Sequence, residues 1–140
     1  MKSILFILTL FVSTMAFSQD IVGEWNNIDE ETGEVNSVIS IYKNGDAYFG
    51  KIIHITNESK RQNRCTKCSD DRKDQLIVGM EILKNLKKDG NRFSGGKILD
   101  PKTGKVYRAE IWVDENDSDK LNVRGYIAFF YDTREWRRKK

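Results

Sequence analysis

Residues 23–25 read Gly23-Glu24-Trp25, and this short stretch decides the expected fold. It stands a few residues after an expected secretory cleavage site, at the start of the first predicted strand. A Gly-x-Trp in this place in an all-β exported domain is typical of a small closed barrel whose indole fills one end. The tripeptide therefore predicts shape and compartment, but it predicts neither a ligand nor a reaction.

The N-terminal segment has the three parts of a secretory signal peptide. Lys2 supplies the positive charge, and residues 4–12 (ILFILTLFV) form the apolar run. Ala16-Phe17-Ser18 then places small residues on both sides of a Phe, as signal peptidase requires. This pattern predicts export of the protein.

We expect cleavage between Ser18 and Gln19, so that 1–18 is the signal peptide and 19–140 is a single domain. The apolar run is well short of the roughly 20 residues that a membrane-spanning helix needs. No Cys follows it to carry a lipid. The expected product is secreted, into the periplasm in a bacterium with two membranes, without stable membrane insertion after cleavage.

Composition restricts the class of partner. The whole chain has a formal net charge of +3, which falls by one when Lys2 is removed. A charge this small and dispersed does not favour nucleic-acid binding. The basic end, residues 134–140, is interpreted as a solvated last strand and tail. The oligomeric state is left open.

Strand-like runs alternate with turn signals at roughly 8–12 residue intervals, the spacing of a β-sandwich or β-barrel. Asn44-Gly45 is the clearest hairpin signal. A short amphipathic helix competes with a strand at 79–86, and we favour the strand because Lys88-Asp89-Gly90-Asn91 reads as another turn. The expected strands are 21–26, 35–43, 46–56, 79–86, 92–99, 105–113, 121–127 and 131–138.

About eight antiparallel strands predict an all-β closed barrel, because eight is the number at which a barrel just closes around packed side chains or one small ligand. A polar stretch, residues 57–75, interrupts the strand pattern. It has few apolar residues to bury and is predicted to be one long surface loop.

The order and spacing of several short blocks resemble a bacterial secreted family, domain of unknown function 2147, which is lipocalin-like. The resemblance implies a lipocalin-type barrel in the bacterial envelope. It implies no activity, because the family is functionally uncharacterised. One departure is Phe93, where the family is expected to have Trp. The matching blocks are Gly23-x-Trp25, Tyr48-x-Gly50-Lys51-Ile52, Cys65-x-x-Cys68, Gly96-x-Ile98-x-Asp100-Pro101-x-x-Gly104-Lys105-x-Tyr107, Leu121-x-Val123-Arg124-Gly125-Tyr126 and Trp136-x-Arg138.

The resemblance also suggests a structural role for the two ends of the domain. In lipocalin-like barrels the first-strand Trp closes one end, and an Arg from the last strand stacks across it. Gly23 and Trp25 with Trp136 and Arg138 are the expected plug, and Arg137 competes for the stacking position. Any ligand would then enter at the opposite mouth.

Cys65 and Cys68 allow three interpretations. A structural disulfide is favoured in an exported protein. A redox-active pair is the second, because Arg64 and Lys67 would lower a thiol pKa. A metal site with His54, the only His, is the third, but structural zinc usually has a second pair of Cys or His ligands. The prediction is a disulfide, with no metal and no cofactor.

A polar set on two late strands depends on which face points inward. If Tyr107 and Val123 face the interior, then Arg108, Glu110 and Arg124 lie outside and form cross-strand pairs. An inversion of the faces would place the three charges in a cavity instead. The outside arrangement is expected.

The first functional hypothesis is a barrel that binds a small apolar or amphipathic molecule. The alternative is an envelope interaction module whose barrel is filled by its own side chains. Gly and Ala at inward positions would leave space, while Phe and Tyr would fill it, and the chain has both. No catalytic constellation is recognised, so no enzyme is expected. The candidate lining residues are Tyr48, Ile52, Phe93, Tyr107, Ile111 and Tyr126.

Overall fold

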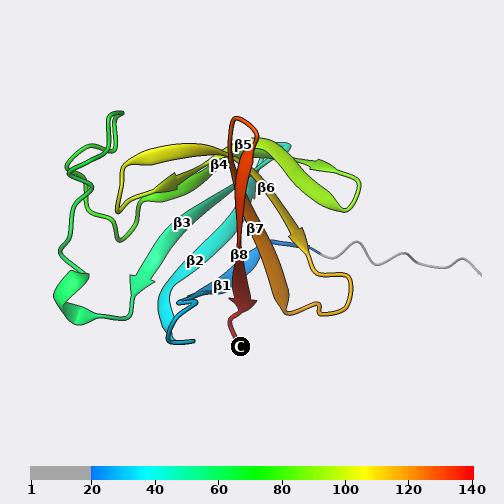
Figure 1. The fold of residues 1–140 in the computed structure, drawn as a ribbon, viewed down its shortest axis with the longest axis horizontal. Coiled ribbons are helices and arrows are strands. Elements are labelled where there is room, and N and C mark those ends of the chain that lie inside the picture. The colour runs from blue at the N-terminus through cyan, green and yellow to red at the C-terminus, as the bar shows by residue number, and fades with distance from the viewer. Residues whose placement is uncertain (1–19) are drawn as a thin grey trace, which may run out of the picture.

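The computed structural model describes residues 20–140, which form one closed antiparallel barrel in which each strand pairs with the next and β8 returns to β1 (Figure 1). The predicted signal peptide lies outside the described residues. A single 3-10 turn, η1 (Glu58–Lys60), interrupts the β structure of this part of the chain. The strands are β1 (Gly23–Ile28), β2 (Val35–Asn44), β3 (Ala47–Ile55), β4 (Glu81–Asp89), β5 (Arg92–Asp100), β6 (Lys105–Val113), β7 (Lys120–Ile127) and β8 (Phe130–Arg138).

The predicted all-β, eight-stranded barrel is confirmed, and β4 is a strand rather than a helix. The first hairpin differs in detail from the Asn44-Gly45 prediction. Asn44 pairs with Ala47, so the turn residues are Gly45 and Asp46. Gly45 has a φ of 66°. A positive φ at the first turn position favours Gly, which explains the one-residue offset.

The barrel closes where the two ends of the domain meet. β1 and β8 are joined by three residue pairs: Trp25 with Arg138, Asn26 with Arg137, and Asn27 with Trp136. These pairs lie at one end of the barrel. Beyond them β1 leads into its turn toward β2, whereas β8 continues along β7 to the hairpin at the top of Figure 1.

Strand alternation separates a packed inner face from a charged outer face. On β6, Ala109, Ile111 and Val113 are buried, while Arg108 is exposed and Glu110 is half-buried. Ile111 pairs with Val123 on β7, and Glu110 pairs with Arg124. The charged set therefore lies outside the barrel, as expected from the alternation of apolar residues.

The inward glycines do not leave a hollow. A Cβ on Gly50 would lie 3.0 Å from Cδ1 of Leu83 and 3.4 Å from Cγ2 of Ile39. A Cβ on Gly125 would lie 3.2 Å from Cβ of Tyr107. Larger neighbours already occupy the space beside these glycines. Gly50 and Gly125 therefore do not create a cavity inside the barrel, because neighbouring side chains pack against both of them.

Candidate functional site

One end of the barrel is sealed by an indole and a guanidinium. Trp25 is fully buried, and its Nε1 donates a hydrogen bond of 2.8 Å to the carbonyl oxygen of Ile21. Cζ of Arg138 lies 4.3 Å from the centre of the Trp25 ring. The neighbouring Arg137 instead forms an ion pair with Asp117, at 2.6 Å. Arg138, not Arg137, therefore takes the stacking position.

Two further residues of this plug have local reasons for their identity. Gly23 has a φ of 137°, which strains any residue with a Cβ. Trp136 is 4% exposed and pairs with Leu121 across the β7–β8 ladder. The plug end is thus built from fully packed aromatic and aliphatic side chains, without access for a ligand.

Four of the proposed lining residues lie in the packed interior. Tyr48, Ile52, Phe93 and Ile111 are 7%, 5%, 3% and 0% exposed. The rings of Tyr48 and Phe93 meet edge to face, with centroids 4.8 Å apart. Side chains around a water-sized cavity would retain accessible surface, and these retain almost none. Phe93 replaces the expected Trp without opening space.

The opposite end of the barrel keeps apolar surface within reach of solvent. Tyr107 near the start of β6 and Ile98 near the end of β5 form a cross-strand pair, and both are half-buried. A Cβ on Gly125 would lie 3.7 Å from Cγ2 of Ile98, so β7 faces this pair. Ile127, two residues further along β7, is 49% exposed. We call Ile98, Tyr107, Gly125 and Ile127 the mouth set.

Charged residues stand around the mouth set. Nε of Arg134 is 2.7 Å from Oδ2 of Asp132 and 3.7 Å from Oε1 of Glu30. The hydrogen bond that Arg134 donates to Asp132, with the nearby charges of Asp132, Glu30 and Asp100, raises the pKa of Arg134 above its usual value. Because these acids come from β8, the β1–β2 turn and the end of β5, Arg134 connects several parts of the rim.

The sixth proposed lining residue, Tyr126, lies on the outer face. Its hydroxyl donates a hydrogen bond of 2.9 Å to Oε2 of Glu110 and accepts one of 3.4 Å from Nη1 of Arg124. It pairs with Arg108 across the β6–β7 ladder. Alternation places it opposite to Gly125, so it is not part of the barrel interior or the mouth.

The outer face carries a ladder of arginines and aromatic rings that the sequence analysis did not identify. Cζ of Arg92 lies 4.0 Å from the Trp112 ring centre, and Cζ of Arg124 lies 4.8 Å from the same ring and 4.2 Å from Tyr131. Arg92 also pairs with Glu110 at 3.0 Å. The period of two in β6 and β7 could have revealed it, because the same rule placed these charges outside. A surface depression of about 390 Å³ adjoins it, lined by Ser94, Gly95, Gly96, Lys97, Arg108, Ala109, Glu110 and Tyr126.

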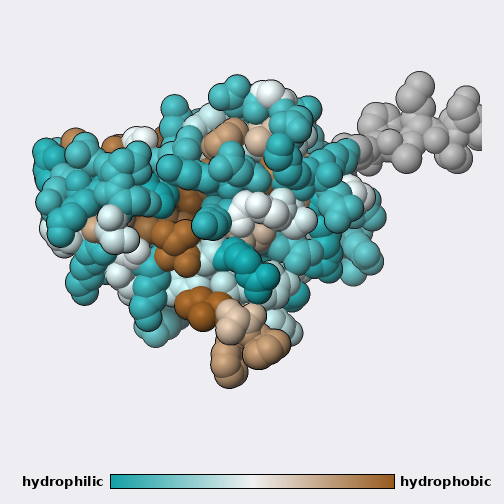
Figure 2. All heavy atoms as spheres, turned by 90° about the horizontal axis from the view of Figure 1, so that it is seen from above, coloured by the Kyte–Doolittle hydropathy of each residue, from teal (hydrophilic) through white to brown (hydrophobic). Residues whose placement is uncertain are grey.

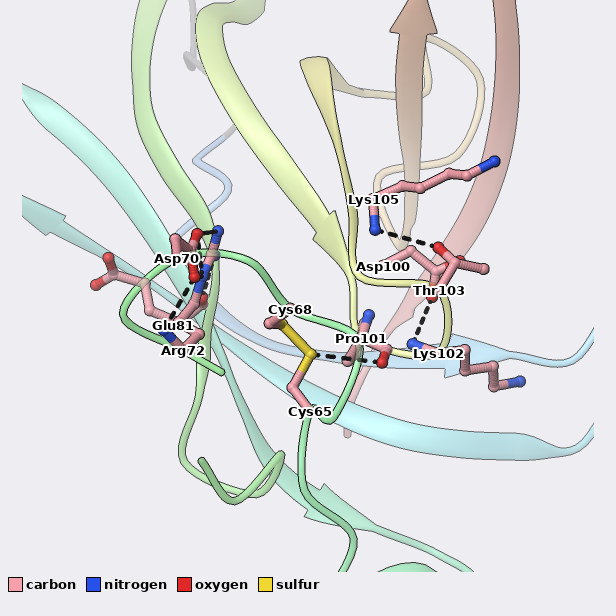
Figure 3. The surroundings of a disulfide bond; sticks show 10 residues. All are labelled: Cys65, Cys68, Asp70, Arg72, Glu81, Asp100, Pro101, Lys102, Thr103 and Lys105. Carbon is pink, nitrogen blue, oxygen red and sulfur yellow. Dashed lines mark hydrogen bonds and ion pairs between the residues drawn. A yellow bond between two sulfur atoms is a disulfide. The ribbon is translucent and has the colours of Figure 1, made fainter. Parts of the chain in front are cut away.

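The long polar loop is attached to the barrel by a disulfide between Cys65 and Cys68 (Figure 3). Both cysteines are buried and join the hydrophobic core. Sγ of Cys65 lies 3.6 Å from the carbonyl oxygen of Pro101 in the β5–β6 turn. Gly104 in the same turn has a φ of 73°, and a Cβ there would overlap the carbonyl group of Lys67. The loop and the turn are thus in direct backbone contact.

A second attachment of the loop to the barrel is made by Arg72, which is held by an ion pair with Asp70 in the same loop. Arg72 is 9% exposed, and its Nη2 is 2.6 Å from Oδ2 of Asp70. Its Nη1 donates a hydrogen bond of 2.9 Å to the carbonyl oxygen of Glu81 at the start of β4 (Figure 3). The hydrogen bond from Arg72 lowers the pKa of Asp70 to about 2. A charged carboxylate at neutral pH therefore helps to hold the loop against β4.

Glu81 also perturbs an outer tyrosine. The hydroxyl of Tyr42 donates a hydrogen bond of 2.7 Å to Oε2 of Glu81. Partial burial, followed by this hydrogen bond and the charge of Glu81, raises the pKa of Tyr42 to about 12. Tyr42 is thus a neutral hydrogen-bond donor to Glu81 at physiological pH.

Within residues 20–140, no three His, Cys, Asp or Glu side chains are grouped so that they could hold a metal ion. His54 is exposed at the end of β3, and the paired cysteines offer no thiolate. In the same part of the chain, no helix has the length and apolarity to cross a bilayer.

An eight-stranded antiparallel barrel, closed at one end by a Trp and an Arg, defines the lipocalin-like class of fold. A solved structure described as protein HP1028 from Helicobacter pylori, which belongs to the lipocalin family, is similar in fold. Its TM-score is 0.73 at 16% sequence identity, over 86% of this chain and 84% of that one. At this identity the likeness concerns the fold alone.

The chain belongs to the family domain of unknown function 2147, described as an uncharacterized protein conserved in bacteria, whose model matches residues 23–138. No curated protein matches the sequence. The family resemblance seen in the sequence is confirmed, and it brings no activity with it.

Proposed function

We propose that the protein is exported to the periplasm and binds a small amphipathic molecule at the open mouth of its barrel. The observation that carries the proposal is a gradient along the inner face. Trp25 and Ile111 toward the plug end are fully buried, whereas Ile98 and Tyr107 are half-buried and Ile127 is 49% exposed. The mouth set is therefore the inward apolar surface that we assign to a ligand.

The apolar part of such a ligand would cover Ile98, Tyr107 and Ile127. Covering an aliphatic or aromatic side chain completely contributes about 1.5–3 kcal/mol, and part of this offsets the entropy lost on binding. The polar end of the ligand would remain at the rim beside Arg134, Asp132 and Glu30, which offer partners of either charge. Tyr48, Ile52, Phe93 and Ile111 would support the site from below rather than contact the ligand.

A second function is favoured by a specific observation. Leu83 and Tyr107 occupy the space beside Gly50 and Gly125. A barrel packed in this way needs no ligand for its stability. It could instead act through its surface as an envelope interaction module. This candidate and the first differ in whether a small molecule binds near Tyr107.

Titration with two fluorescent probes, a fatty acid and a neutral amphiphile, tests the first proposal. Tyr107→Ser removes apolar surface from the mouth set. Val106→Ser is the matched control, because Val106 is the next residue on β6, is 41% exposed and points outward. Binding of at least one probe that is weakened by Tyr107→Ser and unaffected by Val106→Ser supports the mouth site.

Native mass spectrometry of the protein purified from its own cells gives an independent readout. A co-purifying small molecule supports the first function. Failure of both probes to bind, together with a mass equal to that of the polypeptide alone, would leave the interaction module as the function. The N-terminal sequence of the same preparation tests export, since a mature chain beginning at Gln19 is expected.

A further inference from the structure

The tip of the β7–β8 hairpin is an exposed apolar projection. Phe129 is 97% exposed, Phe130 79% and Tyr131 60%. In Figure 1 this hairpin reaches the top of the molecule, and Figure 2 shows an apolar projection at the lower edge of a largely hydrophilic face. Large apolar groups gathered in this way on a soluble domain usually mark an interaction site.

Turn chemistry does not explain the composition of this tip. The β2–β3 turn consists of Gly45 and Asp46, residues that favour a tight solvated turn. The β7–β8 turn consists of Ala128 and Phe129, between the paired residues Ile127 and Phe130. Ala128 has a φ of 51°, a conformation that is strained for a residue with a Cβ. The hairpin thus has both a strained backbone and exposed aromatic side chains. A turn of glycine and polar residues would have avoided both.

A guanidinium holds the strained turn in place. Nη2 of Arg108 on β6 donates a hydrogen bond of 3.2 Å to the carbonyl oxygen of Ala128. Cζ of Arg108 also lies 5.7 Å from the centre of the Tyr126 ring. The projecting aromatic side chains are therefore presented from a braced hairpin, which reduces the conformational entropy that docking would remove.

Two arginine side chains lie next to the aromatic tip. Arg108 contacts the turn directly, and Cζ of Arg124 lies 4.2 Å from the Tyr131 ring centre. Two carboxylates on β6 and β8 form ion pairs with other arginines: Glu110 with Arg92 at 3.0 Å, and Asp132 with Arg134 at 2.7 Å. Arg108 and Arg124 thus leave an excess of positive charge beside the apolar projection.

We propose that this tip docks on the surface of an anionic phospholipid membrane. Phe129 and Phe130 would enter the boundary between head groups and acyl chains, and Tyr131 would stay at the level of the head groups. Arg108 and Arg124 would then face lipid phosphates. Aromatic side chains favour this interfacial region, and basic residues beside them add attraction to anionic lipids.

A membrane surface suits the shape of the tip better than a second copy of the chain does. The tip is convex, and a fluid bilayer accepts a projecting side chain without a preformed pocket. A symmetric pair of tips would bring Arg108 and Arg124 of one copy toward the same residues of the other. Such like-charge contacts oppose a twofold interface. The docking is peripheral, and it does not depend on the proposed small ligand.

Vesicle co-sedimentation of the processed protein tests the proposal, with phosphatidylcholine vesicles with or without phosphatidylglycerol. The double variant Phe129→Ser/Phe130→Ser removes the tip. Val22→Ser is the control, because Val22 is also an exposed apolar residue, 40% exposed, but lies next to the plug end. Circular dichroism melts of all three proteins establish that they are folded.

The protein and the Val22→Ser control are expected to bind phosphatidylglycerol vesicles equally, and salt should weaken that binding. The double variant should bind about tenfold to a hundredfold more weakly, from the partial burial lost at two Phe side chains. Two results would overturn the proposal. One is the absence of vesicle binding by the unmodified protein. If sedimentation velocity then shows dimers that the double variant does not form, the tip is an interface between copies of the chain instead. The other is equal vesicle binding by the double variant.

Discussion

Replacement of the plug indole is the most direct test of how this barrel is stabilised. Trp25 is fully buried, donates a 2.8 Å hydrogen bond to Ile21 and lies 4.3 Å from Cζ of Arg138. Trp25→Ala removes that packing and leaves a cavity, which costs about 3–5 kcal/mol for a buried Trp. For a domain of this size the expected fall in melting temperature is about 10–20 °C.

Trp25→Phe separates the ring from its hydrogen bond. It keeps an aromatic side chain but leaves the carbonyl oxygen of Ile21 without its donor, a loss of about 1–3 kcal/mol. Arg138→Ala, alone and combined with Trp25→Ala, completes a double-mutant cycle. The expected coupling is about 0.5–2 kcal/mol, the range of a cation–π contact.

Chemical denaturation followed by circular dichroism measures these free energies of unfolding. Trp112→Ala is the matched control, because Trp112 is a half-buried Trp on the outer face of β6. Its loss should be much smaller than that of Trp25→Ala. Melting temperatures within a few degrees of each other for the unmodified protein and Trp25→Ala would refute the structural role of the plug.

The remaining predictions concern the long loop. Gly104→Ala should destabilise the domain clearly more than Gly45→Ala in thermal melts: both positions have a positive φ, but only at Gly104 does a Cβ overlap backbone, that of Lys67. Equal decreases in melting temperature for the two variants would mean that the loop backbone shifts at Lys67 without a cost in stability. Asp70, whose pKa falls to about 2 beside Arg72, contributes stability above its unfolded pKa of about 3.9 and loses that contribution as pH falls toward 2. Asp70→Asn should therefore be less stable than the unmodified protein at pH near 6, with the difference in unfolding free energy vanishing toward pH 2; a difference independent of pH would exclude this ion pair as its source.

Several features could be predicted from the sequence because they depend on local patterns. The period-two alternation of Tyr107 to Val113 places charges outside, whatever the neighbouring strand is. Glycine and polar residues end strands for local backbone reasons, so eight strands and one long polar loop were predictable. The pair Cys65 and Cys68 was correctly predicted to be a disulfide, since the predicted export would permit one.

Side-chain contacts between distant strands could not be predicted in this way. Arg137 and Arg138 are equivalent candidates in the sequence, and the β1–β8 register alone decides that Arg138 lies over Trp25. The same holds for Tyr126, which was proposed as a lining residue and instead hydrogen-bonds Glu110 on the outer face. The register of a strand depends on the strand with which it pairs, so the sequence of one strand alone does not determine which side chains meet.

The sequence by itself determined an all-β barrel and the family, because periodicity and motif spacing are local properties of the chain. Only the tertiary structure decided whether the barrel is hollow. In the sequence, Gly50 and Gly125 suggest empty space inside the barrel. In the structure, side chains from neighbouring strands, Leu83 and Tyr107, occupy that space. The free volume inside a barrel depends on side chains that are far apart in the chain, so only their packing in the folded structure determines it. Because the interior is packed, the candidate binding surfaces are the mouth set and the β7–β8 tip.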